Sequence, residues 1–244
     1  MRKYDKYKNT NIEWIGEIPE HWVIKQLRYV SSQISAGGTP STKVEKYWNQ
    51  NDYVWLPSGR VQNKEIVITN KEKYISQSGL ENSSTKLIDP NTTLIALTGA
   101  TCGNIGYLTF KACANQSVVS INNNETFDSK FLFYYLLSQR EQIRLKQSGG
   151  AQGGINTEDV KSLKFVSPSI EEQIQISSYL DNKTSLIDRL INNNKKLIKL
   201  LEEKRTALIN KVITKGLDPN VKMKDSGIEW IGEIPEHWEV KKLK

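Results

Sequence analysis

The strongest constraint on the fold is a long helical pattern between residues 171 and 213. Neither glycine nor proline interrupts it, and its apolar residues recur with the heptad spacing of a coiled coil. Ser169 and Glu172 fit a Ser-x-x-Glu capping box that begins a helix, and Gly216 is placed to end it. A helix of about 43 residues would be roughly 65 Å long, so a domain of this size covers only part of its apolar stripe. We therefore predict that the stripe packs against a second helix.

The heptad spacing also predicts which side chains meet that second helix. An asparagine at a seam position fixes the register of a coiled coil at some cost in stability, and the run of asparagines at 192–194 places one there. The alternative is a single helix that packs along its own domain. The predicted seam residues are Leu180, Ile187, Leu190, Asn194, Leu197, Leu201 and Leu208.

An internal repeat is the second constraint. Residues 10–28 return as residues 226–244 with 13 of 19 positions identical, including the unbroken matches Ile12–Trp22 and Ile228–Trp238. In each copy a proline breaks regular structure, while tryptophans and isoleucines offer a large apolar area for docking. We interpret each copy as an anchoring segment, and the chain as one complete unit followed by the opening of a second. The alternatives are a local duplication without architectural meaning and, for the second copy, a disordered tail.

The segment between the first copy and the long helix has the pattern of an α+β domain. Short β-rich runs alternate with turns, and one helix is predicted from Ser129 to Gly149. A glycine-rich loop at 148–154 separates this helix from the last strand. The predicted strands are 53–56, 66–68, 93–98, 106–110, 117–121 and 163–166.

These patterns divide the chain into three parts and give an α+β fold class: one β-rich domain followed by a long coiled-coil-forming helix. We assign residues 1–168 to the domain with its N-terminal anchor segment and 169–215 to the helix. Residues 216–244 are then the start of a truncated second repeat.

Composition narrows the possible functions. The 244 residues carry a formal net charge of +7, which favours acidic partners, and no apolar run is long enough to span a membrane. The chain has no G-x-x-x-x-G-K-[ST], C-x-x-C, H-E-x-x-H or G-x-S-x-G motif, and Cys102 and Cys113 are too few for a disulfide scaffold or zinc site. His21 is better explained as a structural contact than as a base. We expect a cytoplasmic protein without metal, cofactor or catalytic activity of its own.

Seven short motifs follow one another along nearly the whole chain, and their ordered combination is more specific than any one of them. They are Ile12–Trp22, Gly37–Ser41, Thr98–Gly106, Asn115–Gln116, Gly149–Gly154, Pro168–Gln173 and Leu201–Arg205. Together they resemble the specificity subunit of type I DNA restriction and modification enzymes. That resemblance implies two target recognition domains, each followed by a long helix; the two helices pack antiparallel and hold the domains apart, and methyltransferase subunits dock onto them.

This chain has one such domain and one helix, so it resembles a half subunit. The implied function is a non-catalytic subunit for DNA sequence recognition and assembly, which acts as an antiparallel homodimer on a two-part palindromic site. Its implied partners are double-stranded DNA, a second copy of itself, and the modification and restriction subunits. The alternatives are a helical protein-interaction module whose β-rich domain binds a non-DNA ligand, and an unrecognised enzyme.

Polar loops of the domain supply groups suited to phosphates and to base edges. Arginine can pair with guanine, and glutamine or asparagine with adenine, while lysines hold phosphates. The loops concerned are 37–48, 58–64, 98–104, 115–117 and 147–154. The predicted DNA-binding residues are Gly38, Thr39, Ser41, Lys43, Lys46, Ser58, Arg60, Gln62, Asn63, Lys64, Thr101, Asn104, Gln116 and Gln152.

Overall fold

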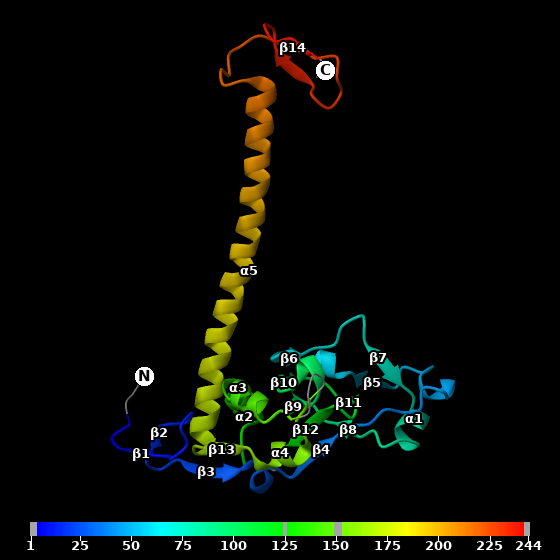
Figure 1. Cartoon of the computed structure of the whole chain (residues 1–244), viewed down its shortest axis with the longest axis vertical. Helices are drawn as coiled ribbons and strands as arrows, with labels where there is room; N and C mark the ends of the chain where they lie inside the picture. The colour runs from blue at the N-terminus through cyan, green and yellow to red at the C-terminus, as the bar shows by residue number, and fades with distance from the viewer. Residues whose placement is uncertain (1–3, 124–125, 149–152, 242–244) are drawn as a thin grey trace. The chain divides into compact units, whose positions relative to one another are not determined.

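The computed structural model describes residues 4–123, 126–148 and 153–241. The chain forms two compact units, Met1–Asp181 and Asn182–Lys244, and helix α5 (Ile170–Lys215) contributes to both. Two sheets and four short helices form most of the first unit (Figure 1). The second unit contains the larger part of α5 and a two-stranded sheet.

The larger sheet of the first unit has five strands and the smaller has four. In spatial order the larger sheet contains β4 (Gln33–Ala36), β12 (Val118–Asn122), β9 (Thr92–Ala96), β10 (Ile105–Leu108) and β6 (Lys64–Ile66). The smaller sheet contains β7 (Lys73–Ile75), β5 (Tyr53–Leu56), β11 (Ala112–Ala114) and β8 (Leu87–Ile88). A separate pair joins β3 (Val23–Gln26) to β13 (Lys164–Ser167), the strand that leads into α5.

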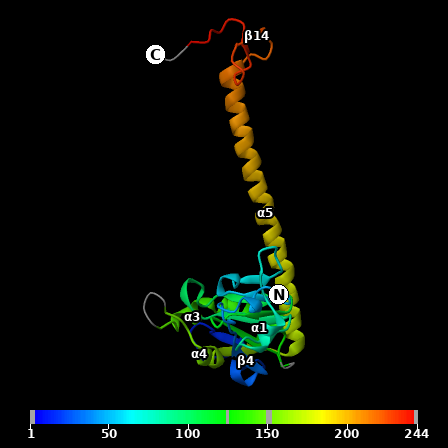
Figure 2. The same cartoon turned by 90° about the vertical axis from the view of Figure 1, so that its right-hand side faces the viewer.

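The short helices lie around these sheets, and Figure 2 shows α1, α3 and α4 from a second side. They are α1 (Gln77–Glu81), α2 (Ser129–Ser138), α3 (Arg140–Leu145) and α4 (Thr157–Ser162). Single 3-10 turns occur at Leu27–Tyr29, Glu45–Tyr47, Ser58–Arg60 and Gly99–Thr101.

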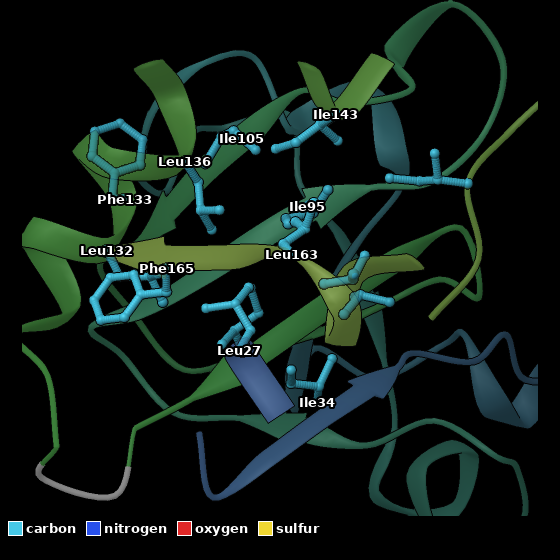
Figure 3. Close-up of a cluster of buried hydrophobic side chains, with 14 of the residues drawn as sticks. Leu27, Ile34, Ile95, Ile105, Leu132, Phe133, Leu136, Ile143, Leu163 and Phe165 are labelled. Carbon is cyan, nitrogen blue, oxygen red and sulfur yellow. The ribbon is translucent and has the colours of Figure 1, made fainter. Parts of the chain in front are cut away.

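Strand β9 is the centre of the core because it is buried on both faces. On one face Ile95 joins the cluster formed with α2, α3 and β13, where Leu132 and Phe165 are fully buried (Figure 3). On the other face Leu94 and Ala96 pack among side chains of the smaller sheet. Successive side chains of a strand point to opposite faces, so one central strand serves two apolar layers.

The structure differs from the sequence predictions in the position and number of elements, and strands β3, β4, β7, β8 and β11 were not predicted. The single helix expected at 129–149 is two helices, because the amide of Gln139 bonds both the Tyr135 and Leu136 carbonyls and the backbone leaves the helical path there. Helices α1 and α4 were not predicted, although Asn156 and Asp159 form a capping box at the start of α4. The strand expected at 66–68 ends at Ile66.

Helix α5 begins and ends where the sequence predicted. The Ser169 amide donates to Glu172 Oε2 at 3.2 Å, and the Glu172 amide donates to Ser169 Oγ at 3.3 Å, which completes the capping box. The helix ends at Gly216, whose φ of +73° lies in the left-handed region that glycine adopts without strain.

The two copies of the repeat fold alike. Strands β1 (Tyr7–Asn9) and β2 (Glu17–Pro19) pair antiparallel, and β14 (Met223–Asp225) and β15 (Glu233–Pro235) pair in the same register 216 positions later. We call residues 6–22 the N-terminal module and residues 222–238 the C-terminal module.

Replacing Leu132 by alanine is expected to lower the free energy of unfolding by about 2 to 5 kcal/mol, because a fully buried leucine leaves a cavity. Leu145→Ala is the matched control on α3, since that side chain is 77% exposed and should cost less than about 0.5 kcal/mol. Urea unfolding of the two variants measures the difference, and equal losses would contradict this description of the core.

Candidate nucleic-acid interface

The loops predicted to read DNA leave the sheets at a common end. The end of β5 lies beside the end of β11, because these strands are parallel and the Asn115 amide donates to the Leu56 carbonyl at 3.0 Å. The chain after β4 joins them, since the Gly38 amide donates to the Ala114 carbonyl at 2.8 Å. The chain after β9 lies at the same end, since the Leu97 amide donates to the Ser117 carbonyl at 2.8 Å. We call this surface, residues 37–41, 57–63, 97–104 and 115–117, the loop rim.

Side chains also connect segments of the loop rim that are distant in sequence. The Thr39 hydroxyl donates to Gln116 Oε1 at 2.6 Å, and the Asn63 amide nitrogen donates to Asn104 Oδ1 at 3.2 Å. An isolated bridge pairs Thr98 with Gly154, which brings the described end of the fifth predicted loop to the same place. The tertiary structure therefore gathers most of the predicted loops on one surface.

Some predicted residues are engaged in the framework of this surface. Asn104 donates to the Val61 carbonyl at 3.0 Å while its Oδ1 accepts from neighbouring side chains. Gly38 is buried, and a Cβ there would lie 2.5 Å from Ser84 Oγ, so only glycine fits. Asn63 holds a left-handed backbone with φ of +58°, and its Oδ1 accepts from the Ile105 amide.

The Arg60 side chain is bonded to two groups of the protein itself. Its Nη2 atom donates to Glu72 Oε1 at 2.5 Å and to the Val67 carbonyl at 2.8 Å. The Glu72 side chain is only 1% exposed, so its charge is compensated mainly by this arginine. Within the described residues the buried Arg60 Nε has no hydrogen-bond partner.

The remaining predicted residues divide by exposure. The exposed ones are Thr39, Ser41, Lys43, Lys46, Gln62, Lys64 and Gln116, and Ser58 and Thr101 are half-buried. Lys46 lies beside α1, since its carbonyl accepts from Ser76 Oγ at 2.7 Å, rather than on the loop rim. Gln152 lies outside the described residues.

Two arginines at the loop rim were missed by the sequence analysis. Arg140 donates from Nη2 and Nε to Asn104 Oδ1 at 3.0 and 3.2 Å. Arg144 lies so close to Gly103 that a Cβ on that glycine would approach Arg144 Cγ to 2.6 Å. Their spacing of four residues places both on one face of α3, which was the available sequence signal.

The first turns of α5 are fixed to the domain by buried polar groups. Gln173 is 1% exposed; its Oε1 accepts from the Asp128 amide at 2.9 Å and its Nε2 donates to the Pro168 carbonyl at 3.0 Å. Lys130 forms ion pairs with Glu65 of β6 and with Asp181 of α5. Burial alone would lower the pKa of Lys130, but Glu65 and Asp181 together raise it above its ordinary value.

Glu172 joins the N-terminal module to the start of α5. His21 Nε2 lies 3.1 Å from both carboxylate oxygens, and Trp22 Nε1 donates to Oε1 at 3.3 Å. Burial would raise the pKa of Glu172, but hydrogen bonds from His21, the Ser169 amide and Trp22 lower it below its ordinary value.

Beyond its first turns α5 presents an exposed apolar stripe. The described part of unit two leaves Leu190 60%, Leu201 55% and Leu208 59% exposed. Isolated exposed leucines are common on protein surfaces, but a continuous stripe marks an interaction surface. The seam prediction is thus compatible with the exposure of these side chains.

A metal-binding cluster or a membrane-spanning helix among the described residues would point to another function. No cluster of three or more His, Cys, Asp or Glu side chains there is arranged to hold a metal ion. Among the described helices, none combines the length and apolar character needed to cross a bilayer. Cys102 and Cys113 are both buried free thiols.

Comparison with known proteins decides the family. A family model for the type I restriction modification DNA specificity domain matches residues 19–203. The chain belongs to this family. It is 29% identical over 244 residues to the type I restriction enzyme MjaIX specificity subunit of Methanocaldococcus jannaschii, an alignment that covers 98% of this chain and 54% of that protein. It is 24% identical over 204 residues to the type I restriction enzyme EcoR124I/EcoR124II specificity subunit of Escherichia coli. That alignment covers 81% of this chain and 47% of that protein.

Solved structures share the fold. A chain from a study of complex assembly and conformational transition of the type I R-M system superposes with a TM-score of 0.66 at 18% identity, covering 82% of this chain and 47% of that one. The HsdS subunit from Thermoanaerobacter tengcongensis gives 0.60 at 17% identity, covering 86% and 48%. The resemblance and the α+β fold class are therefore confirmed. The chain spans about half the length of the curated relatives it matches.

Replacing Glu172 by glutamine should lower the free energy of unfolding by about 1 kcal/mol at neutral pH, because hydrogen bonds to a charged acceptor are lost. Since folding lowers the pKa of Glu172, its stabilisation is complete above the ordinary glutamate value of about 4.3 and is lost as pH falls through the lower folded value. Thermal unfolding between pH 7 and pH 3 tests this, with the exposed neighbour change Glu171→Gln as control. A difference between E172Q and the unchanged protein that persists at the lowest pH would contradict the role of the charge.

Proposed function

We propose that this chain is a non-catalytic DNA sequence-recognition and assembly subunit of a type I restriction and modification system. The observation that carries the proposal is the loop rim, where four loops separated in sequence converge at one end of two sheets and Gly154 pairs with Thr98. Convergent polar loops on a rigid β framework are a common arrangement for recognition surfaces. Family membership supplies the class of target, because the matching domain is a DNA specificity domain.

The loop rim and the residues beside it contain groups for both parts of DNA recognition. Lys64 at the start of β6, and Arg140 and Arg144 on α3, supply positive charge suited to phosphates, which give affinity without sequence information. Gln116 is exposed, and because its Oε1 accepts from Thr39, its amide nitrogen is the group that we assign to a base edge. Arg60 is already bonded to Glu72, so we assign it chiefly to support of the surface.

The long helix supports the proposal that two copies assemble. In an antiparallel pair related by a two-fold axis, positions equally far before and after the axis face each other. Five of the seven predicted seam residues have this symmetry about Asn194: Ile187 and Leu201 lie 7 positions away, and Leu180 and Leu208 lie 14 away. An asparagine pair at the axis would fix the register, and the homodimer would present two domains to a two-part palindromic DNA site.

The partners follow from the same proposal. A subunit that reads DNA without catalytic groups needs modification subunits to methylate the site and restriction subunits to cut DNA. The relatives named above are specificity subunits of type I restriction enzymes, which supports this assignment. We place the assembly in the cytoplasm, where it meets DNA. Mapping methylated sites in cells with and without this chain tests the function, and an identical methylation pattern would contradict it.

Lys64→Ala should weaken binding to all duplex sequences alike and reduce the magnitude of the slope of log K against log salt by about 0.9, the contribution of one phosphate contact. Lys111→Ala is the control, because Lys111 precedes β11 and lies at the end of the sheet opposite the loop rim. Fluorescence anisotropy over a salt series measures both. Equal slopes for the two variants would remove Lys64 from the interface.

Gln116→Ala should instead relax the preference for one base pair by about 1 to 3 kcal/mol while non-specific binding stays unchanged. Gln33→Ala provides the matched control, since Gln33 begins β4 and is exposed at the opposite end of that strand. Competition binding with single-base variants of the mapped site measures the change. Unaltered discrimination in Q116A would show that another part of the surface reads the sequence.

Insertion of one heptad into α5, with leucine at its seam positions, should lengthen the unread spacer of the DNA site by roughly three base pairs, because it adds about 10 Å of helix. A seven-residue glycine and serine insert serves as control, since it adds the same number of residues without extending the helix. Methylation-site mapping gives the spacer. An unchanged spacer in the heptad variant would show that the length of α5 does not set the length of the spacer.

A further inference from the structure

The C-terminal module reproduces the N-terminal module in its backbone and not only in its sequence. Both begin with a two-stranded pair of identical register and turn at a glycine, Gly16 or Gly232, with φ of +67° or +68°. The backbone bonds recur at an offset of 216: Glu20 to Lys6 at 3.0 Å and Glu236 to Lys222 at 2.8 Å, then Trp22 to Pro19 at 3.0 Å and Trp238 to Pro235 at 2.9 Å. Ile18 and Ile234 are each 4% exposed. Two separate segments therefore form the same small folded unit.

The N-terminal module shows what such a unit binds. Its His21 and Trp22 contact the carboxylate of Glu172, which is also the capping-box residue of α5. The target is thus a helix start that presents a glutamate side chain. The contact joins residues 150 positions apart, so it is tertiary and does not depend on sequence proximity.

The C-terminal module carries the same histidine and tryptophan on the same backbone. His237 is exposed, as is His21, and Trp238 is half-buried, as is Trp22. Trp238 also lies at the end of α5, because a Cβ on Gly216 would be 3.6 Å from its Cζ2 atom. Trp230, the equivalent of Trp14, is 83% exposed.

The register of the proposed dimer places this module beside a suitable target. Glu172 and Gly216 each lie 22 positions from Asn194, one before it and one after it. In an antiparallel pair centred on Asn194, Glu172 of one chain therefore faces Gly216 of the other. Because Trp238 packs at Gly216, the C-terminal module of each chain lies next to the helix start of its partner.

We propose that the C-terminal module of one chain docks on the start of α5 in a second copy of this chain, at Glu172, in the place that the N-terminal module occupies within its own chain. The two modules are interchangeable because they present the same histidine and tryptophan from the same backbone. The inference rests on the homodimer in the proposed function, and not on DNA reading. Its consequence is a dimer held at both ends of the helix pair as well as along the seam.

Cysteine crosslinking between differently tagged full-length chains tests the proposal. One chain carries Glu172→Cys and the other His237→Cys, and oxidised glutathione is the oxidant, so any mixed disulfide joins two chains. His21→Cys with Glu172→Cys in a single chain is the positive control, since those side chains lie 3.1 Å apart. The native thiols compete poorly, because both are buried and burial raises the pKa of the Cys113 thiol to about 12.

We expect the mixed disulfide to form, and its yield to rise several-fold when the E172C chain also carries His21→Ala and Trp22→Ala, because the competing module is then removed. In otherwise unchanged chains, His237→Ala with Trp238→Ala should raise the dimer dissociation constant about tenfold, whereas the exposed control change Lys241→Ala should not. A dimer by sedimentation that gives no mixed disulfide, even with His21 and Trp22 replaced, overturns this inference and leaves the proposed dimer intact. A monomer by sedimentation overturns both.

Discussion

The attachment of helix α5 to its own domain is the contact on which the rest of the structure depends. Gln173 is buried and bonded at both ends of its side chain, and Lys130 joins Asp181 of the helix to Glu65 of the larger sheet. Removing one partner of such a contact leaves a buried polar group unpaired, which costs about 1 to 3 kcal/mol. These contacts fix the first turns of α5, up to Asp181, to the sheet whose strand ends carry the loop rim.

The same helix has two kinds of surface because its sequence changes character along its length. Near its start, small and polar residues such as Ser177 face the domain and are buried. Farther on, the leucines of the seam have no domain to cover them in the described structure and remain exposed. A helix fixed at one end and apolar beyond it suits an assembly subunit, because partner binding buries the apolar surface without disturbing the domain. Recognition and assembly can thus reside in one short chain.

In the duplicated module, too, the residues that determine the fold are separate from the exposed residues that make contacts. Its fold is set locally by a glycine turn and one buried isoleucine, so it forms twice in different surroundings. Its binding property resides in an exposed histidine and a neighbouring tryptophan, which the backbone displays in the same way each time. The proposed exchange between chains rests on this shared backbone and on the contact that His21 and Trp22 make with Glu172.

The sequence by itself determined the elements that depend on local chemistry: the capping box at Ser169, the stop at Gly216, the heptad pattern, and the repeat with its common fold. It also predicted most loops of the candidate site, because turn residues mark them. Only the tertiary structure decided what those loops do to one another: it bonds Arg60 to Glu72, places Arg140 on Asn104, and leaves Lys64 and Gln116 exposed. The reason is physical, since caps and turns depend on residues within a few positions, whereas burial and pairing of a side chain depend on strands brought together from distant parts of the chain.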